Sequence, residues 1–223
     1  MVGIFEESLI DKITEDTYVI SDTHFGHKNI MSFEPGRENK MKEDGFENHE
    51  EWLISKWNNV ISKEDTILHL GDFAFKGVQD TIKKLNGNKI FVLGNHDAPA
   101  KASKWNGSDV FNGFYIKNNQ YETKVLSNDL MFSGFIKEMM GYKILFSHYP
   151  VFDADEWDRK NLKIAPRIEA IEVLYKENKC NLNIHGHIHS NKNAFSNSIN
   201  VCVEHLNFEP IKIKELINIY KRK

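Results

Sequence analysis

Five short apolar runs in this sequence each end abruptly in aspartate, histidine or asparagine. The polar segments that follow them are Asp22-Thr-His24, Gly71-Asp72, Gly94-Asn95-His96-Asp97, His148 and His185-Gly-His187-Ile-His189. In α/β proteins, ligands bind just beyond the carboxyl ends of the strands. If the apolar runs are strands, the five polar segments can converge on one crevice.

The residue types in these segments are typical of a metal centre without thiolate ligands. In an extended segment, alternate side chains point to the same side, so both members of an Asp-x-His or His-x-His pair can reach one point. Carboxylate, amide and imidazole ligands suit Mn²⁺, Fe, Zn²⁺ or Ni²⁺ better than a structural zinc cage. The candidate ligands are Asp22, His24, Asp72, Asn95, His148, His187 and His189.

These seven side chains are too many for one tetrahedral ion, but they suffice for two ions that share a bridging carboxylate. Two ions about 3.5–4 Å apart can activate a hydroxide and stabilise both oxygens of an in-line displacement at phosphorus. The sequence therefore predicts a phosphoesterase with two divalent metal ions, with manganese as the favoured metal.

Short apolar runs alternate with amphipathic stretches, which predicts a single domain over residues 1–223. The predicted strands are Thr17–Ile20, Thr66–Leu70, Lys89–Leu93, Lys143–Phe146, Asn181–Ile184 and Ile199–Val203. The predicted helices are Glu47–Ile61, Val78–Leu85, Ala165–Glu177 and Glu209–Tyr220, the last with Pro210 at its opening. We expect Phe111–Met140 to be an antiparallel excursion or surface loop near the site, with strand-like pieces at Phe114–Ile116, Thr123–Leu126 and Leu130–Phe132.

Composition restricts the class of partner. The 29 basic and 32 acidic residues give a net charge of −3, which argues against strong binding to long nucleic acid, since such binding needs a basic surface. A small nucleotide substrate is still allowed, because metal ions can supply positive charge locally. The two cysteines, Cys180 and Cys202, form no disulfide-rich pattern. With no signal-peptide pattern and no long apolar stretch, we expect a cytoplasmic protein that does not enter a membrane.

The ordered set D-x-H, G-D, G-N-H-D, H and G-H-x-H resembles the calcineurin-like metallophosphoesterase superfamily. Each element is weak alone, but all five occur in the family's order between Asp22 and His189, each after a strand-like run. The segments SDTHFGHKNI, LHLGDFAF, LGNHD and SHYP look similar to those of a small bacterial or phage branch. The resemblance implies an α/β (α+β) fold in which two mixed β-sheets pack as a sandwich flanked by helices, in four layers.

The resemblance also implies a role for each candidate residue, with Asp72 bridging the two ions. The first metal would be held by Asp22, His24, Asp72 and His189, and the second by Asp72, Asn95, His148 and His187. His96 would contact the phosphate and protonate the leaving oxygen, and Asp97 would orient its ring. The implied reaction is direct attack by a hydroxide that bridges the metals, without a covalent enzyme intermediate.

Other polar residues are candidates for substrate binding or for support. Asn95 and His27 are candidate substrate contacts, and Arg37, in a predicted polar loop, either clamps a phosphate or is an ordinary surface arginine. His69 and His185 are expected to be hydrogen-bonded core residues or to lie behind the ligands rather than to bind metal.

The aromatic residues near the motifs leave two interpretations open. Trp52 and Trp57 are expected to pack in a helix core. Trp105, Tyr149 and Trp157 lie in loop-like regions, where they either form a pocket wall or pack internally.

Three functions follow from these features. The first is a phosphodiesterase acting on a small nucleotide-like molecule, because a diester that leaves as an alkoxide benefits from the proton donor of a complete G-N-H-D element. The alternative enzyme is a phosphomonoesterase, including one that acts on phosphoprotein. A non-catalytic scaffold is disfavoured, since it should lose ligand positions and none is lost. No G-x-S-x-G element or P-loop supports a serine hydrolase or a triphosphate-binding protein.

Overall fold

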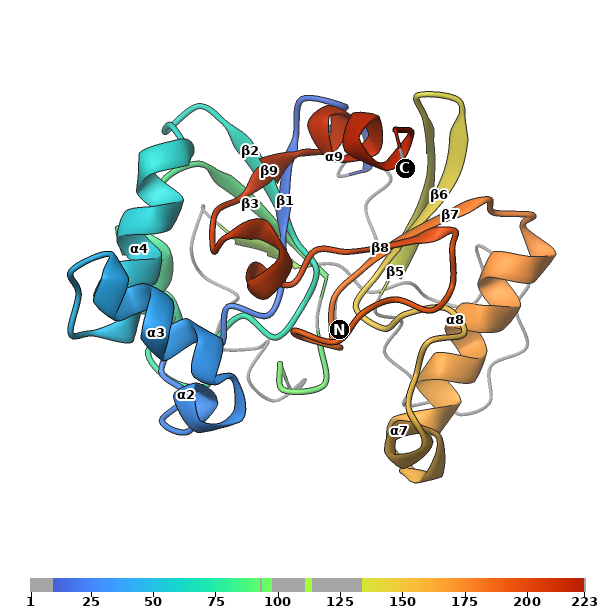
Figure 1. Ribbon diagram of the computed structural model, residues 1–223. Coiled ribbons are helices and arrows are strands. Elements are labelled where there is room, and N and C mark those ends of the chain that lie inside the picture. Colours follow the sequence, from blue (N-terminus) through green and yellow to red (C-terminus); the bar gives the residue numbers. More distant parts are fainter. Residues whose placement is uncertain (1–9, 93, 98–110, 114–133, 223) are drawn as a thin grey trace.

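The computed structural model describes residues 10–92, 94–97, 111–113 and 134–222. Its strands form a five-stranded sheet, in the order β4-β3-β2-β1-β9, and a four-stranded sheet, in the order β5-β6-β7-β8. The two sheets pack against each other, with helices on their outer sides (Figure 1). The predicted sandwich of two mixed sheets flanked by helices is therefore confirmed.

The first sheet carries the first three polar segments. Its strands are β1 (Tyr18–Ile20), β2 (Thr66–His69), β3 (Asn88–Phe91), β4 (Phe111–Gly113) and β9 (Ile211–Lys212). Strands β1 to β4 are parallel to their neighbours, and β9 pairs antiparallel with β1. The carboxyl ends of β1, β2 and β3 consequently lie at one edge of the sheet.

The second sheet carries the remaining polar segments. Its strands are β5 (Gly134–Met139), β6 (Tyr142–Ser147), β7 (Leu182–His185) and β8 (Ser198–Asn200). Strand β7 is parallel to both β6 and β8, whereas β5 pairs antiparallel with β6. His148 directly follows β6, and the segment with His187 and His189 follows β7, so these side chains also share one edge.

Both faces of the first sheet are buried, because neighbouring apolar side chains along its strands point into two different cores. Val19 and Leu68 belong to the core between the sheets. Their neighbours Ile20 and Ile67 belong to a second core beneath α4 (His49–Val60) and α5 (Val78–Lys84). Successive side chains of a strand point to opposite faces, so apolar runs without polar alternation indicate burial on both sides.

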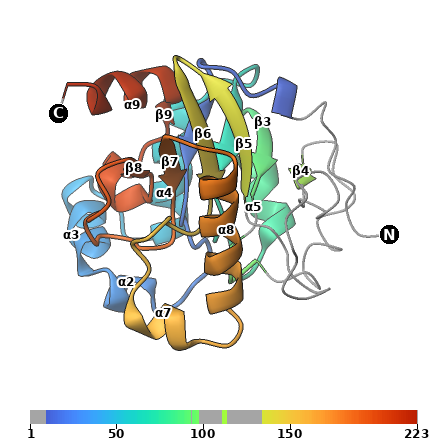
Figure 2. The same cartoon turned by 90° about the vertical axis from the view of Figure 1, so that its right-hand side faces the viewer.

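Helix α8 (Ala165–Glu177) covers the second sheet and has the predicted bounds. In Figure 2 it stands in front of β6 and β7. Helix α4 begins where the side chain of Asn48 accepts hydrogen bonds from the backbone N–H groups of Glu50 and Glu51. This cap satisfies two of the free N–H groups at the helix start.

Three short helices near the site were not predicted: α2 (Ile30–Phe33), α3 (Pro35–Glu43) and α7 (Glu156–Lys160). Helix α3 corrects the interpretation of its segment as a polar loop. It buries only Arg37 and Met41, so it lacks the apolar stripe that identifies a helix in sequence.

The C-terminal elements also differ from expectation. Pro210 precedes strand β9, and the helix α9 (Ile213–Tyr220) begins only after it. The strand expected at Ile199–Val203 ends at Asn200, and Val203 begins the 3₁₀ helix η2 (Val203–Leu206).

Only the ends of the expected excursion at Phe111–Met140 fall within the described part of the chain. They are the short strand β4 and the longer strand β5. The three strand-like pieces predicted between them lie outside the described residues, as does Trp105. No helix in the described part of the chain combines the length and the apolar character that crossing a membrane requires.

Candidate metal centre

Hydrogen bonds join the loops that carry the candidate ligands. Within the first sheet, the backbone N–H of Asp22 donates to the carbonyl of Gly71 at 3.0 Å. Within the second, Gly186 N–H donates to the carbonyl of His148 at 3.0 Å. The backbone N–H of His187 donates to Asp22 Oδ2 at 2.9 Å and so connects the two sheets. The backbone N–H of His96 donates to Asp72 Oδ1 at 2.8 Å, so all five polar segments meet at one site, as expected.

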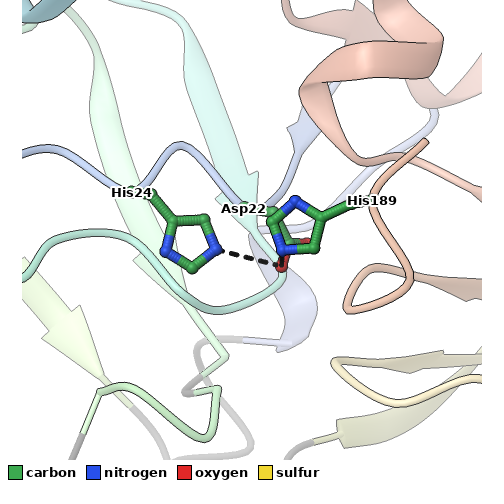
Figure 3. Close-up of side chains that lie close together, drawn as sticks. All are labelled: Asp22, His24 and His189. Atoms are coloured by element: carbon green, nitrogen blue, oxygen red, sulfur yellow. Dashed lines mark ion pairs between the residues drawn. The ribbon is translucent and has the colours of Figure 1, made fainter. Parts of the chain in front are cut away.

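Asp22, His24 and His189 form one group of convergent side chains (Figure 3). Asp22 Oδ1 lies 3.8 Å from His24 Nε2 and 3.9 Å from His189 Nε2. Within the described structure, Asp22 Oδ1 and His24 Nε2 are buried and have no hydrogen-bond partner. Leaving such polar atoms unpaired is costly, and a cation bound between them would remove that cost.

Asp72 lies between this group and a second one. Its Oδ2 atom is 3.7 Å from His24 Nε2 and 3.7 Å from His148 Nε2. A position between two sets of ligands is the one that a bridging carboxylate needs. Asp22, Asp72 and His148 also form a convergent group, which shares Asp22 with the first, and a third group, Glu34, His189 and Glu204, shares His189 with the first.

The tautomer of His148 follows from its surroundings. Its Nδ1 atom lies 2.9 Å from the carbonyl oxygen of Leu70, and a carbonyl only accepts, so Nδ1 carries the proton. The lone pair of Nε2 is then directed into the site. Asn95 Oδ1 lies 2.9 Å from this nitrogen. Both atoms can ligate one cation, and the role of each as a ligand remains a prediction.

Five of the seven candidate ligands have a left-handed backbone. Their φ angles are 57° at Asp22, 51° at His24, 53° at Asp72, 75° at His187 and 48° at His189. The expectation that the Asp-x-His and His-x-His pairs lie on extended segments is therefore wrong. Each left-handed non-glycine residue costs on the order of 1–3 kcal/mol, and turns of this kind redirect the side chains toward one point.

Two glycines allow the loops to approach the ligands. A Cβ atom on Gly71, where φ is +98°, would lie 2.5 Å from Nδ1 of His148. A Cβ atom on Gly94 would collide with the side chain of Asp72. Any larger residue at either position would therefore displace a candidate ligand.

Burial sets the protonation of the cluster. It lowers the pKa of His24 to about 4 and the pKa of His148 well below its usual range. Burial, together with the charges of Asp97 and Asp22, raises the pKa of Asp72 well above its usual range. Neutral imidazoles beside crowded carboxylates are suited to a divalent cation, which would stabilise the ionised acids.

His96 and Asp97 differ in exposure and in their contacts. His96 has a side chain that is 46% exposed, and its Nε2 lies 3.9 Å from Asp72 Oδ2. The buried carboxylate of Asp97 instead accepts hydrogen bonds from the backbone N–H groups of Phe73, at 3.1 Å, and Gly94, at 3.0 Å. This carboxylate connects the two loops, and its orientation of the His96 ring stays a prediction.

Arg37 is neither a surface arginine nor placed to clamp a phosphate, because it is fully buried. Its Nε donates to Glu204 Oε1 at 2.6 Å, and its remaining nitrogens donate to the carbonyls of Asp22, at 2.8 Å, and Thr23, at 3.2 Å. Glu204 Oε1 also lies 3.5 Å from Nδ1 of His189. The guanidinium thus stabilises the backbone of the loop that carries Asp22 and His24.

Asp158 on α7 is a second supporting acid that the sequence did not reveal. Its Oδ2 lies 2.8 Å from His187 Nε2. Histidine ligands usually donate their other ring N–H to such an acceptor, so a carboxylate behind each ligand could be expected. Neither Asp158 nor Glu204 carries a motif, and nothing in the sequence selects them from 32 acidic residues.

Three further histidines lie next to the candidate-ligand loops. His69 and His185 are buried and hydrogen-bonded, as predicted. A ring nitrogen of His69 lies 3.1 Å from Thr23 Oγ1, and a ring nitrogen of His185 lies 2.8 Å from the carbonyl oxygen of Gly186. His27 is half-buried, and its ring centroid lies 4.1 Å from that of Phe75. A contact of His27 with substrate remains a prediction.

A pocket of about 530 Å³ opens beside the candidate ligands. Its lining includes Asp72, Asn95, His96, His187 and His189. A larger groove of about 1320 Å³, along α9 and β8, contains none of the candidate ligands. Chemistry rather than volume therefore identifies the functional pocket.

Comparisons with known proteins agree with this arrangement. Residues 16–191 match the family model of the calcineurin-like phosphoesterases. An uncharacterized protein of Methanocaldococcus jannaschii, MJ1445, is 26% identical over 220 residues, which cover 92% of this chain and 91% of that protein. The gene 66 protein of Mycobacterium phage L5 is 34% identical over 90 residues, or 38% of this chain and 41% of the phage protein.

A similar fold occurs in a crystal structure of a protein of unknown function from Aquifex aeolicus, AQ665. The TM-score is 0.65 with 30% sequence identity, over 91% of this chain and 98% of the other. The family match spans all the candidate ligands from Asp22 to His189. The chain therefore belongs to the calcineurin-like phosphoesterase family.

Proposed function

We propose that the protein is a two-metal phosphodiesterase that hydrolyses a small nucleotide-like phosphate diester. The observation that carries this proposal is the set of buried polar atoms without hydrogen-bond partners at the meeting point of the five loops. Asp22 Oδ1 and His24 Nε2 are buried without partners in the described structure, and Asp72 Oδ2 lies 3.7 Å from both His24 and His148. Divalent ions bound there would supply an activated water and would stabilise charge at phosphorus.

His96 is the residue best placed to contact the phosphate. Its half-exposed ring lies in the pocket beside Asp72. Burial lowers the pKa of His96 to about 4, so the ring is neutral at pH 7 in the free protein. A neutral imidazole still donates one N–H to a phosphate oxygen. The negative charge of a bound phosphate would favour the protonated ring that gives a proton to the leaving oxygen.

The charge of the pocket favours a diester over a monoester. Its wall carries Glu34, Asp153, Asp155 and Asp158, and Lys192 is the only lysine or arginine among the described lining residues. A phosphate monoester carries nearly two negative charges at neutral pH, whereas a diester carries one. The acidic wall repels the monoester more strongly, and Arg37 is buried too deeply to compensate.

A metal-by-substrate panel tests the proposal. The metal-free protein is loaded with Mn²⁺, Ni²⁺, Zn²⁺ or Mg²⁺, and each form is assayed against methyl p-nitrophenyl phosphate and p-nitrophenyl phosphate. We expect hydrolysis that depends on added metal, with Mn²⁺ most effective and the diester preferred. Preference for the monoester with every metal would make the protein a phosphomonoesterase instead.

Substitutions separate an enzyme from a scaffold. Asp72→Ala and His189→Ala should each lose bound metal and hydrolysis. His205→Ala serves as the matched control, since His205 is an exposed histidine outside the convergent groups. If the Asp72 and His189 variants kept both metal and activity, the two-metal proposal would be wrong.

A further inference from the structure

Trp157 combines exposure with a position at the functional pocket. Its side chain is 66% exposed, whereas Trp52 and Trp57 are 0% and 1% exposed. A single exposed apolar residue needs no explanation by itself. Trp157, however, lines the pocket that also contains His187 and His189.

The helix that carries Trp157 is fixed relative to the candidate ligands. The next residue, Asp158, is buried and lies 2.8 Å from His187 Nε2. The Asp155 side chain caps the start of α7 by accepting from Asp158 N–H at 2.8 Å. Arg159 donates to Glu172 of α8 at 2.8 Å. The indole of Trp157 is therefore carried by a helix that is held in place by these contacts. The neighbouring residue, Asp158, contacts the candidate ligand His187.

The pocket offers little positive charge with which to bind the rest of a substrate. Glu34, Asp153 and Asp155 face it, with Lys192 as the one lysine or arginine in its described lining. Binding beyond the phosphate must then depend on uncharged contacts. Stacking on an aromatic face provides such a contact and accepts any nucleobase. A volume of about 530 Å³ is in the range of small-molecule sites.

We infer that Trp157 is the stacking platform for the nucleobase of a small phosphate diester. The inference rests on the proposed function and adds to it the residue that recognises the base. It makes Trp157 a determinant of specificity, which acts on binding of the base and leaves the chemistry at phosphorus to the residues around Asp72.

The test compares two ligands that share a phosphate monoester and differ in the base. Binding of AMP and of ribose 5-phosphate to the Mn²⁺-loaded protein is measured by isothermal titration calorimetry. We expect AMP to bind about 5- to 150-fold more tightly, the range that stacking of one base provides. Trp157→Ala should weaken AMP by this factor and leave ribose 5-phosphate unchanged. Trp157→Phe, which keeps an aromatic face, should retain part of the preference.

Leu162→Ala is the matched control, because Leu162 is 92% exposed and follows the same helix but does not line the pocket. This variant should keep the wild-type preference for AMP. Equal affinity for the two ligands, no binding of AMP at millimolar concentration, or equal weakening of both by Trp157→Ala would each overturn the inference.

Hydrolysis of methyl p-nitrophenyl phosphate, which has no base, tests the proposed function separately. If the protein hydrolyses this diester but shows no Trp157-dependent preference, only the stacking platform is wrong. If the preference depends on Trp157 but no diester is hydrolysed, only the proposed phosphodiesterase activity is wrong.

Discussion

The carboxylate of Asp158 lies 2.8 Å from Nε2 of His187 and is buried beside it. The short helix α7 thus holds the ring of a candidate metal ligand through the nitrogen Nε2. A carboxylate that accepts from Nε2–H fixes the tautomer and leaves Nδ1 as the nitrogen available to a metal. The contact joins residues 29 positions apart, so it depends entirely on the tertiary fold.

Asp158→Asn should weaken metal binding without unfolding the protein. The amide no longer provides a negatively charged acceptor. Loss of a carboxylate that accepts a hydrogen bond from a metal-binding histidine typically lowers metal affinity 10- to 100-fold. We expect the dissociation constant for Mn²⁺, measured by calorimetry, to rise by about this factor. Glu156→Gln, which neutralises an exposed acid of the same helix, is the control. Equal affinity in the two variants would show that Asp158 does not support the metal centre.

The buried ion pair between Arg37 and Glu204 has a different consequence, for stability. Glu204→Gln leaves the guanidinium of Arg37 uncompensated at a site with no exposure. Breaking a buried pair by removing one partner costs on the order of 3–5 kcal/mol. We expect a loss of this size in the free energy of unfolding of the metal-free protein, measured in urea.

A double variant and a surface pair provide the controls for this prediction. Arg37→Met combined with Glu204→Gln should be less destabilised than the sum of the single variants, because no charge is left unpaired. Glu38→Gln removes a partner of the exposed pair with Lys42 and should cost no more than about 1 kcal/mol. A loss of similar size for Glu38→Gln and Glu204→Gln would contradict the prediction.

The strand pattern and the five polar segments could be predicted because both depend on local sequence. Apolar runs such as that of β2 are buried on both faces, and the residues that follow them reach one edge because parallel strands end together. The order of the motifs then identified the family without knowledge of the fold.

The supporting contacts could not be predicted, because they depend on how distant segments meet. Arg37 lies in a helix that buries only two of its residues, so no apolar periodicity in the sequence locates this helix. Glu204 reaches Arg37 across 167 positions. The contacts of Asp97 with backbone N–H groups likewise depend on the approach of two loops, which the pattern G-N-H-D does not encode.

The left-handed backbone of His189, with φ of 48°, makes a further prediction about stability. Glycine adopts this conformation freely, whereas alanine does not. Both His189→Gly and His189→Ala remove the imidazole, but the glycine variant should be more stable by about 1 kcal/mol. His148 is not among the described residues with positive φ, so there the alanine variant should be more stable than the glycine variant. Urea unfolding of the four metal-free variants measures both differences. If alanine were more stable than glycine at both positions, backbone strain at His189 would be excluded.

His49 should make the stability of the metal-free protein depend on pH. It begins α4, and burial lowers its pKa to about 3. The unfolded chain, with a histidine pKa near 6.5, therefore binds a proton that the folded protein excludes, and stability falls as the pH decreases through this range. Between pH 7 and pH 5 the loss is about 2 kcal/mol. His49→Gln should reduce the decrease in unfolding free energy over this interval by that amount, whereas His205→Gln, at an exposed position, should not. Parallel pH profiles for wild type and His49→Gln would show that folding does not lower the pKa of His49.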